Sequence, residues 1–311
     1  MAKLLKLMTK TGVLKLRKIS FLPILLALFL LGCKSVPVQT TQVNPLDLLD
    51  TDSSLYIRIP VKSHTKLVSS LLESNINGIV SDDATKMAGY LDVIYAGLSS
   101  KDDRKRLQVA VKGSLPSLTA VALKKSGWKK YSVKSNSLSE SLLSLTSFQN
   151  ASNTMQLSLL EQNSIACLAQ DISPMLSNYA KYSALNYTYT DQDDIWRTSR
   201  LYSWVSEETD NIKFYIVRPQ NFLSILLGNT VSSSYFKLVY TCGEISQDQN
   251  GKYNLTLELE FKDSRLIKGA LAMLEVALGL TDAQFENTTP THIKVTGINI
   301  SFTQLLKMLG Y

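Results

Sequence analysis

The chain has 311 residues and a net charge of +7, with 33 lysines and arginines against 26 aspartates and glutamates. Six basic residues and no acidic ones precede Cys33, so the chain from Cys33 onward has 27 basic against 26 acidic residues, a net charge of +1. A balance this close to zero gives no indication of nucleic-acid binding, so we expect no nucleic-acid partner. Hydrophobic residues make up 45% of the chain, which is enough for the core of a globular protein.

The first 32 residues have the three parts of a secretory signal. Lysines and an arginine are spread over positions 3–18, an eleven-residue apolar run follows at 21–31, and the small Gly32 precedes Cys33. As a helix the apolar run would span about 16 Å, short of the roughly 30 Å of bilayer hydrocarbon. We therefore interpret residues 1–32 as a signal peptide. The alternative is an uncleaved signal anchor with an incidental cysteine.

The residues Leu30-Leu31-Gly32-Cys33 resemble the bacterial lipobox, in which the cysteine is acylated and becomes the new N-terminus. On this relaxed lipobox and its general character, the chain resembles the spirochaetal, Treponema-type outer-envelope lipoproteins of uncharacterised function. The resemblance implies lipidation of Cys33 and membrane attachment through the N-terminal acyl chains. Lys34 stands where an aspartate would indicate inner-membrane retention in enteric bacteria, which favours the outer membrane. We assign residues 33–49 to the lipidated cysteine and a flexible tether.

Beyond the tether, the hydrophobic pattern predicts strands alternating with helices. In chain order we predict strand 55–60, helices near 67–72 and 82–91, strands 93–96 and 107–111, helix 116–125, strands 155–160 and 165–169, helix 172–182, strands 214–219, 238–241 and 255–259, helix 264–278, strand 292–300 and helix 302–309. Residues 132–152 are ambiguous between a loop and an edge strand. Asn250-Gly251 predicts a hairpin turn, because both residues tolerate positive φ.

Two stretches of this pattern resemble each other. Leu55 to Pro60 reads LYIRIP and Phe214 to Pro219 reads FYIVRP, and each is followed by the same order of elements. We therefore predict an α+β fold of two tandem, duplicated β-α-β-β-α units, residues 50–190 and 191–311, with antiparallel sheets and helices on one face of each. The alternative is that two unrelated halves arrived at a common order.

The sequence contains no recognisable catalytic or metal-ligating constellation. His64 and His292 lack the short-spaced partners of a metal site, and no nucleophile elbow, phosphate loop or Rossmann glycine pattern is present. We therefore expect no enzyme activity, no cofactor and no metal. Cys167 and Cys242 lie in strand-like runs, and the sequence leaves open whether they form a disulfide in an exported protein.

One segment is unusually rich in aromatic residues. From Tyr179 to Trp204 there are seven aromatics in 26 residues, against 26 in the whole chain. Tyrosine and tryptophan combine apolar area with a polar tip, which suits interfaces. The candidate ligand or partner surface comprises Tyr187, Tyr189, Trp196, Arg197, Arg200, Tyr202 and Trp204. The alternative is that these aromatics fill the junction between the two units.

We interpret the chain as a membrane-anchored, non-catalytic lipoprotein that binds an unidentified protein or small-molecule ligand at the cell envelope. One alternative is an envelope assembly or scaffolding protein without a ligand pocket. The other is an enzyme of unrecognised type, which converging ionisable side chains in a cleft would favour.

Overall fold

The structure is a computed structural model that describes most of the chain from residue 43 onward. The described residues are 43–75, 80–101, 104–133, 147–150, 154–184, 189–217, 219, 237–248, 250–278 and 283–308. They belong to one unit, Thr41–Tyr311. The predicted signal peptide, Cys33, the first part of the tether and Tyr187 lie outside the described residues.

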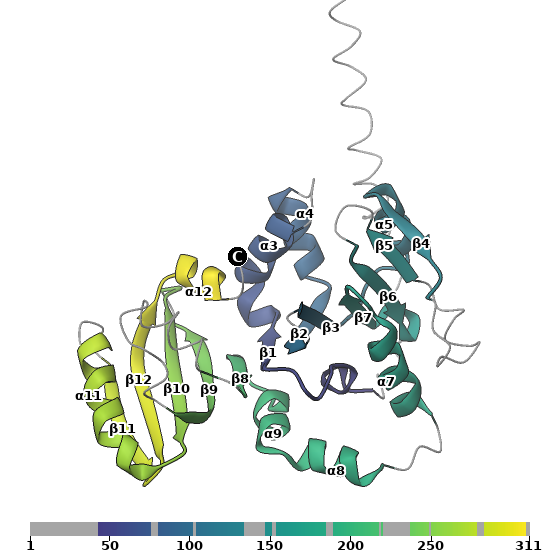
Figure 1. Ribbon diagram of the computed structural model, residues 1–311. Helices are drawn as coiled ribbons and strands as arrows, with labels where there is room; N and C mark the ends of the chain where they lie inside the picture. Colours follow the sequence, from purple (N-terminus) through teal and green to yellow (C-terminus); the bar gives the residue numbers. More distant parts are fainter. Residues whose placement is uncertain are drawn as a thin grey trace, which may run out of the picture. The chain divides into compact units, whose positions relative to one another are not determined.

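The described strands form a single antiparallel sheet (Figure 1). In chain order they are β1 (Leu55–Pro60), β2 (Leu91–Lys101), β3 (Arg104–Gly113), β4 (Trp128–Tyr131), β5 (Ser147–Asn150), β6 (Gln156–Leu160), β7 (Ile165–Ala169), β8 (Ile212–Ile216), β9 (Leu238–Gln247), β10 (Tyr253–Phe261), β11 (Gln284–Thr289) and β12 (His292–Ile300). Their order across the sheet is β11-β12-β10-β9-β8-β1-β2-β3-β7-β6-β5-β4. An antiparallel sheet with helices was predicted and is confirmed.

The prediction of two separate sheets is wrong, because β1 and β8 pair and join the two halves. Leu55 lies opposite Ile216, and Arg58 lies opposite Lys213. Left apart, each strand would expose a row of unpaired backbone donors and acceptors, and the pairing satisfies both rows. The hydrophobic alternation of a strand is the same whether its edge is paired or open, so the sequence did not reveal this junction.

Helices cover both faces of the sheet, whereas the sequence predicted helices on one face. The helices are η1 (Pro45–Leu48), η2 (Lys62–His64), α3 (Thr65–Asn75), α4 (Ser81–Ala88), α5 (Thr119–Lys125), η3 (Glu161–Asn163), α7 (Ser173–Ser183), α8 (Asp191–Thr198), α9 (Arg200–Ser206), η5 (Ser264–Leu266), α11 (Ile267–Leu278) and α12 (Phe302–Met308). In Figure 1, α3 and α4 lie on one side of the central strands, and α7 and α9 lie on the other. No helix in the described part of the chain is both long and apolar enough to cross a membrane.

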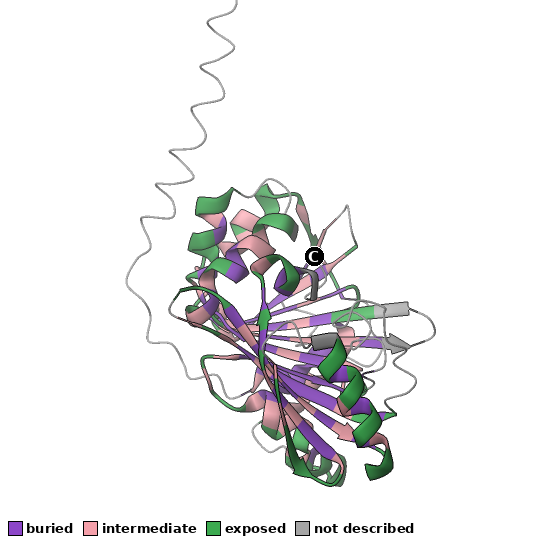
Figure 2. Cartoon of the chain, turned by 90° about the vertical axis from the view of Figure 1, so that its left-hand side faces the viewer, coloured by how far each residue is buried: buried purple, intermediate pink, exposed green. Residues whose placement is uncertain are grey.

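The side chains of β1 show why both faces need cover. Ile59 shares one apolar cluster with Leu67 of α3. Tyr56 shares a second cluster with Met175 of α7. Residues 56 and 59 differ by an odd number of positions, so their side chains leave opposite faces of the strand. Figure 2 shows buried residues concentrated along the strands.

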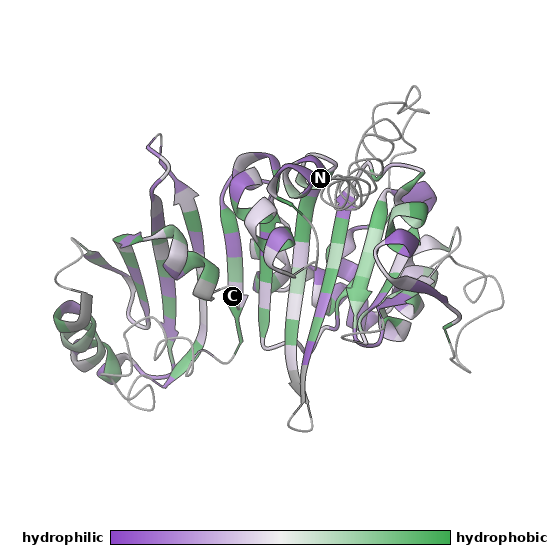
Figure 3. Ribbon diagram, turned by 90° about the horizontal axis from the view of Figure 1, so that it is seen from above, coloured by the Kyte–Doolittle hydropathy of each residue, from purple (hydrophilic) through white to green (hydrophobic). Residues whose placement is uncertain are grey.

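In the second half, the sheet has one apolar and one polar face. Along β10, buried residues alternate strictly with half-buried ones, and Figure 3 shows the matching alternation of hydropathy. The buried residues of β10 face α11 and α12, in the same cluster as Leu274 and Leu305. The other face carries Glu258 and Glu260, as expected of an antiparallel sheet with one wet face.

Residues 43–49 are packed against the sheet, so the predicted tether to residue 49 is wrong for this part. The side chain of Asn44 caps η1 by accepting a hydrogen bond of 3.0 Å from the Leu46 amide, and Pro45 follows at the start of the helix. Leu46, Leu48 and Leu49 are completely buried. The apolar area that these leucines bury offsets the conformational entropy lost when residues 43–49 become ordered.

Two further questions raised by the sequence have answers in the structure. Gly251 has a φ of +78°, and β9 and β10 pair across this turn with Gln247 opposite Tyr253, so the hairpin prediction is confirmed. Cys167 and Cys242 are both buried free thiols. The described part of the ambiguous segment 132–152 includes β5.

Gly243→Ala should destabilise the protein, because a Cβ at Gly243 would lie 2.5 Å from the Thr256 carbonyl oxygen and 2.6 Å from Cζ of Phe214. We expect the free energy of unfolding to fall by about 2 kcal/mol, within the range for overpacked cores. Gly269→Ala on α11 is the matched control: no atom lies within 4 Å of the new Cβ. Its helix propensity should raise stability by up to about 1 kcal/mol. Urea denaturation measures both, and equal effects would contradict the close packing at β9.

Candidate functional site

The described candidate residues lie on or beside α8 and α9, the two short helices between α7 and β8. We call Tyr189, Trp196, Arg197, Arg200, Tyr202 and Trp204 the aromatic seam. Thr190 begins α8 with a reciprocal capping box to Asp193. Ser199 ends α8 and caps α9, since its Oγ accepts a 3.1 Å hydrogen bond from the Tyr202 amide. These caps fix where each helix begins and therefore which side chains face the sheet.

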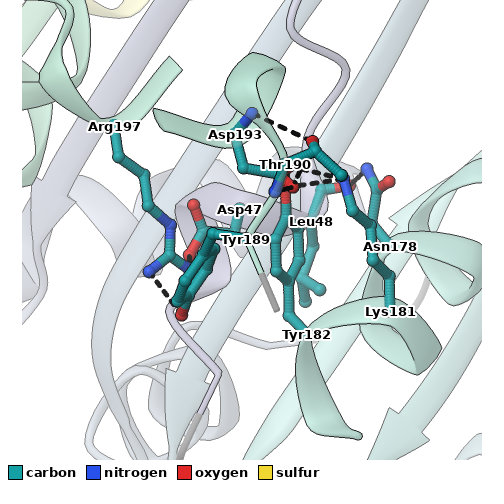
Figure 4. A network of polar contacts seen from close by, with 9 residues as sticks. All are labelled: Asp47, Leu48, Asn178, Lys181, Tyr182, Tyr189, Thr190, Asp193 and Arg197. Atoms are coloured by element: carbon teal, nitrogen blue, oxygen red, sulfur yellow. Dashed lines mark hydrogen bonds and ion pairs between the residues drawn. The ribbon is translucent and has the colours of Figure 1, made fainter. Parts of the chain in front are cut away.

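Asp193 anchors α8 to α7 through a polar network (Figure 4). It is 3% exposed, forms an ion pair with Lys181, and accepts a 2.7 Å hydrogen bond from the Tyr182 hydroxyl. Burial, helped by the hydrogen bond to Asp193, raises the pKa of Tyr182 to about 12. Tyr182 therefore remains a neutral hydrogen-bond donor at physiological pH, and the network holds structure rather than performing proton transfer.

Trp196 belongs to the core rather than to a ligand surface. It is 8% exposed. Its ring lies 5.6 Å from Tyr56 of β1 and 5.5 Å from Tyr202, the latter edge-on. Aromatic pairs at these distances contribute roughly 0.5–1.5 kcal/mol beyond the area they bury. For this residue the structure supports the alternative reading, in which the aromatics fill the junction.

Arg197 joins α8 to the segment that follows the tether. Its Nη2 donates to Oδ2 of Asp47 on η1 at 2.7 Å, and the Asp47 side chain is completely buried. Burial raises the pKa of Asp47, and the positive charge of Arg197 opposes that shift. The other side of the guanidinium lies over the Tyr189 ring at 4.1 Å, and Nη1 donates to the Tyr189 hydroxyl at 2.6 Å.

Arg200 forms a second stack nearer the C-terminal half. Its Nη2 lies 2.7 Å from Oε2 of Glu258 on β10, and its guanidinium lies 5.0 Å from the Tyr240 ring centroid. Tyr240 in turn stacks on Tyr215 of β8 at 5.1 Å. One side chain of α9 is thus held over three adjacent strands by an ion pair and a cation–π contact.

Glu258 also contacts two residues, His292 and Cys242, that lie far apart in the sequence. Nε2 of His292 lies 3.4 Å from Oε2 of Glu258, and the Cys242 thiol lies 3.7 Å from the same oxygen. A cysteine nucleophile needs a depressed pKa, whereas burial raises the pKa of Cys242 to about 12. The carboxylate that both residues contact does not activate the thiol, so this arrangement lacks the electrostatics of a catalytic pair.

Trp204 attaches α9 to β8. Its Nε1 donates a 3.1 Å hydrogen bond to the Phe214 carbonyl oxygen. The ammonium of Lys213 lies 4.5 Å from the centroid of the Trp204 ring and forms an ion pair with Glu207. The polar tip of the indole is therefore used within the fold.

The described seam residues lie on or beside α8 and α9, and they differ in how much of each is exposed to solvent. Trp196 is buried, Tyr202 and Trp204 are half-buried, and Tyr189 and Arg200 are exposed. The prediction for Tyr187 lies outside the described residues. Sequence reasoning missed the partners Asp47, Tyr182, Tyr240 and Glu258. A carboxylate among leucines at position 47 was the one available signal, because a buried acid requires a cation.

Two shallow cavities lie away from the seam. The first, of about 280 Å³, is lined by Asp50, Thr51, Asp52, Ser99, Arg106 and Pro174. The second, of about 290 Å³, is lined by Arg58, Pro60, Lys62, Ser63, Asp92, Glu208, Thr209 and Asp210. Within the described ranges, no three or more histidine, cysteine or acidic residues are grouped to hold a metal ion.

The described part of the chain, an antiparallel sheet covered by helices, matches the fold and sequence of a class of outer membrane-associated lipoproteins. The chain belongs to the family of the Treponema pallidum outer membrane-associated lipoprotein TP0453, which matches residues 40–306. The predicted resemblance to Treponema-type lipoproteins is thus confirmed, as is a location in the cell envelope with the outer membrane favoured.

Solved structures of TP0453 share the fold. Crystal form I aligns with a TM-score of 0.61 and 16% sequence identity, over 87% of this chain and 98% of that one. Crystal form III gives a TM-score of 0.60 and 16% identity, over 86% and 98%. No curated protein matches the chain in sequence.

Arg197→Met should destabilise the protein more than Asp47→Asn. The first change leaves a completely buried carboxylate without its cation, and breaking a buried pair in this way costs roughly 3–5 kcal/mol. The second leaves a guanidinium whose side chain is 29% exposed, so water replaces the lost partner and we expect about 1 kcal/mol. Urea denaturation of both variants gives the two values, and the reverse order would contradict the structure.

The same pair predicts a pH dependence. Burial already raises the pKa of Asp47 above its ordinary 3.8, and loss of Arg197 raises it further. Between the two pKa values the folded variant binds a proton that the unfolded chain does not, so its stability increases as the pH falls. The deficit of Arg197→Met should therefore shrink from pH 7 towards pH 4, whereas a constant deficit would count against a buried charged Asp47.

Proposed function

We propose that this lipoprotein is a non-catalytic interaction module, which engages an envelope protein through the exposed part of the aromatic seam. Membership of the outer membrane-associated family supports the location. The two arginine–tyrosine stacks, Arg197 on Tyr189 and Arg200 on Tyr240, support the mode of binding. Arginine and tyrosine are the residue types enriched at the centres of protein interfaces.

Each stack has one exposed member, Tyr189 or Arg200, and is held in place by an ion pair. Tyr189 is 45% exposed, and the Arg200 side chain is 51% exposed. Each arginine is already paired with a carboxylate, Asp47 or Glu258, so little side-chain freedom is lost when a partner binds. The tight packing around Trp196 leaves the seam better suited to a protein surface than to an enclosed small molecule.

Attachment to the membrane is proposed to run through acyl chains on Cys33. One acyl chain binds a membrane marginally and reversibly, so stable anchoring requires more than one chain or a second membrane signal. Residues 43–49 follow the proposed anchor in the chain, and the Asp47–Arg197 pair joins this packed segment to α8. Partner binding would then take place close to the membrane.

Cys33→Ser should abolish lipidation, because serine provides no thiol for the acyl chain. We expect loss of palmitate labelling and release of the protein from sedimented envelopes. Cys242→Ser is the matched control, since its thiol is buried in the folded body and should not affect labelling. Unchanged labelling and sedimentation in Cys33→Ser would overturn the proposed anchor.

Tyr189→Ala and Arg200→Lys should weaken recovery of a partner without unfolding the body. Arg200→Lys keeps the charge beside Glu258 but removes the planar group that stacks on Tyr240. Pull-downs use the lipidated protein from detergent-solubilised envelopes, with an expected loss of about tenfold, as for interface hot spots. Met273→Ala on α11 is the control, because this side chain is similarly exposed at 38%. Full recovery with both seam variants would contradict the proposal.

The packed seam also supports a second candidate, an assembly or scaffolding role without a ligand pocket. Neither of the two shallow cavities is lined by a seam residue. A scaffolding role predicts that deletion of the whole protein alters the composition of the envelope, while Tyr189→Ala with Arg200→Lys complements the deletion. Failure of the double variant to complement would favour the interaction module.

We also propose that the two halves arose by duplication. Tyr56 and Tyr215, the matching residues of LYIRIP and FYIVRP, lie directly opposite each other in the β1–β8 pair. Moving outward, Tyr56 pairs with Gly97 of β2 and Tyr215 pairs with Cys242 of β9. Matching strands thus occupy matching positions on either side of the β1–β8 junction, which supports a common origin.

A further inference from the structure

The cavity of about 290 Å³ lies where β1 runs into η2 and where the chain passes from α9 to β8. Its wall includes Arg58 and Pro60 at the end of β1, and Glu208 and Asp210 from the connection to β8. Small-molecule sites span roughly 300–1,000 Å³, so this volume suits a ligand at the small end of that range. None of its lining residues belongs to the aromatic seam.

Arg58 gives this cavity an unsatisfied charge. The residue is 6% exposed, and its Nη1 donates to the Thr209 carbonyl oxygen at 2.8 Å. No carboxylate of the described residues lies within ion-pair distance of its guanidinium. A buried cation without a counter-ion is costly, and an arginine cannot lower that cost by losing its proton.

The neighbouring strand adds to this positive charge instead of neutralising it. Lys213 lies directly opposite Arg58 in the β1–β8 pair and is 2% exposed. Side chains at directly opposite positions share a face of the sheet, and like charges there are destabilising. Glu207 pairs with Lys213, which leaves Arg58 as the one of these two buried cations without a carboxylate partner among the described residues. An anionic group from outside would complete the site.

The rim of the cavity excludes a simple anion as the best ligand. It carries three carboxylates, Asp92, Glu208 and Asp210, against the cations Arg58 and Lys62. Lys62 is paired with Asp92 at 3.0 Å, and Asp210 accepts a hydrogen bond from Ser63 at 2.7 Å. Glu208 is exposed and lies in the same wall as Arg58. A ligand with both signs of charge would match the buried cation and the acidic rim together.

We propose that this cavity binds a small zwitterion, with its carboxylate on Arg58 and its ammonium group between Glu208 and Asp210. This is the chemistry of a free amino acid and equally of a short peptide. Arginine offers a planar fork of donors that fits a carboxylate. The ligand class follows from the buried guanidinium and the acidic rim, and it does not depend on the seam or on its protein partner.

The test uses the whole mature chain with alanine and other free amino acids, alanyl-alanine, propionate and ethylamine as probes. Binding to the folded state raises the melting temperature, and the rise grows with the logarithm of the ligand concentration once the site is saturated. We expect at least one amino acid or the dipeptide to raise it, and whichever is stronger identifies the source. Propionate and ethylamine each supply half of the required chemistry and should be without effect. No shift with any zwitterion, or an equal shift with propionate or ethylamine, would overturn the proposal.

Two variants and a matched control locate the site. Arg58→Met removes the charge while keeping the apolar stem, and calorimetry should show affinity lower by about tenfold or more, the usual loss for a charged hydrogen-bond partner. Glu208→Gln changes an exposed side chain, so folding is preserved and the loss of affinity should be several-fold. Arg106→Met is the control, because Arg106 lines the other cavity beside Asp50 and Asp52. Unchanged affinity in both Arg58→Met and Glu208→Gln, or an equal loss in Arg106→Met, would overturn the assignment.

Discussion

The pairing of β1 with β8 is the constraint on which the other features depend. It places Tyr56 against Tyr215 and Arg58 against Lys213, and it makes one sheet out of two sets of strands. Because the register of an antiparallel pair fixes which side chains share a face, these contacts follow from the backbone hydrogen bonds. The tyrosines form the floor of the seam, and Arg58 forms part of the wall of the cavity. A slip of one residue by either strand would turn that strand's two side chains to the opposite face.

Residues 43–49 are held against the sheet by an ion pair as well as by buried apolar side chains. The leucines of η1 are completely buried, and Asp47 between them is held by Arg197 of α8. The pair is separated by 150 positions in sequence, so it closes a long loop once the helices are docked.

Local features were predictable from the sequence, and the meeting of distant parts was not. The hairpin at Asn250-Gly251 and the helices near 172–182 and 264–278 follow from turn chemistry and period alone. Three features depend on which surfaces pack together: the pairing of β1 with β8, the covering of both faces, and the burial of residues 43–49. The hydrophobic alternation of a segment does not indicate its packing partner. Among the candidate site residues, composition found the segment but could not separate the buried Trp196 from the exposed Tyr189. That difference depends on capping by Thr190 and Ser199, which sets the rotation of each short helix.

The seam and the cavity differ in whether their cations have carboxylate partners within the chain. At the seam, Arg197, Lys181 and Arg200 each have a carboxylate partner within the chain. At the cavity, the more deeply buried Arg58 has a backbone carbonyl and no carboxylate among the described residues. Folding alone favours replacing or pairing such a charge, since an apolar side chain of similar volume is often no less stable. A seam whose cations already have carboxylate partners can present a fixed surface to a protein. A cavity that keeps an unpaired guanidinium is instead arranged for a group that the chain itself does not supply.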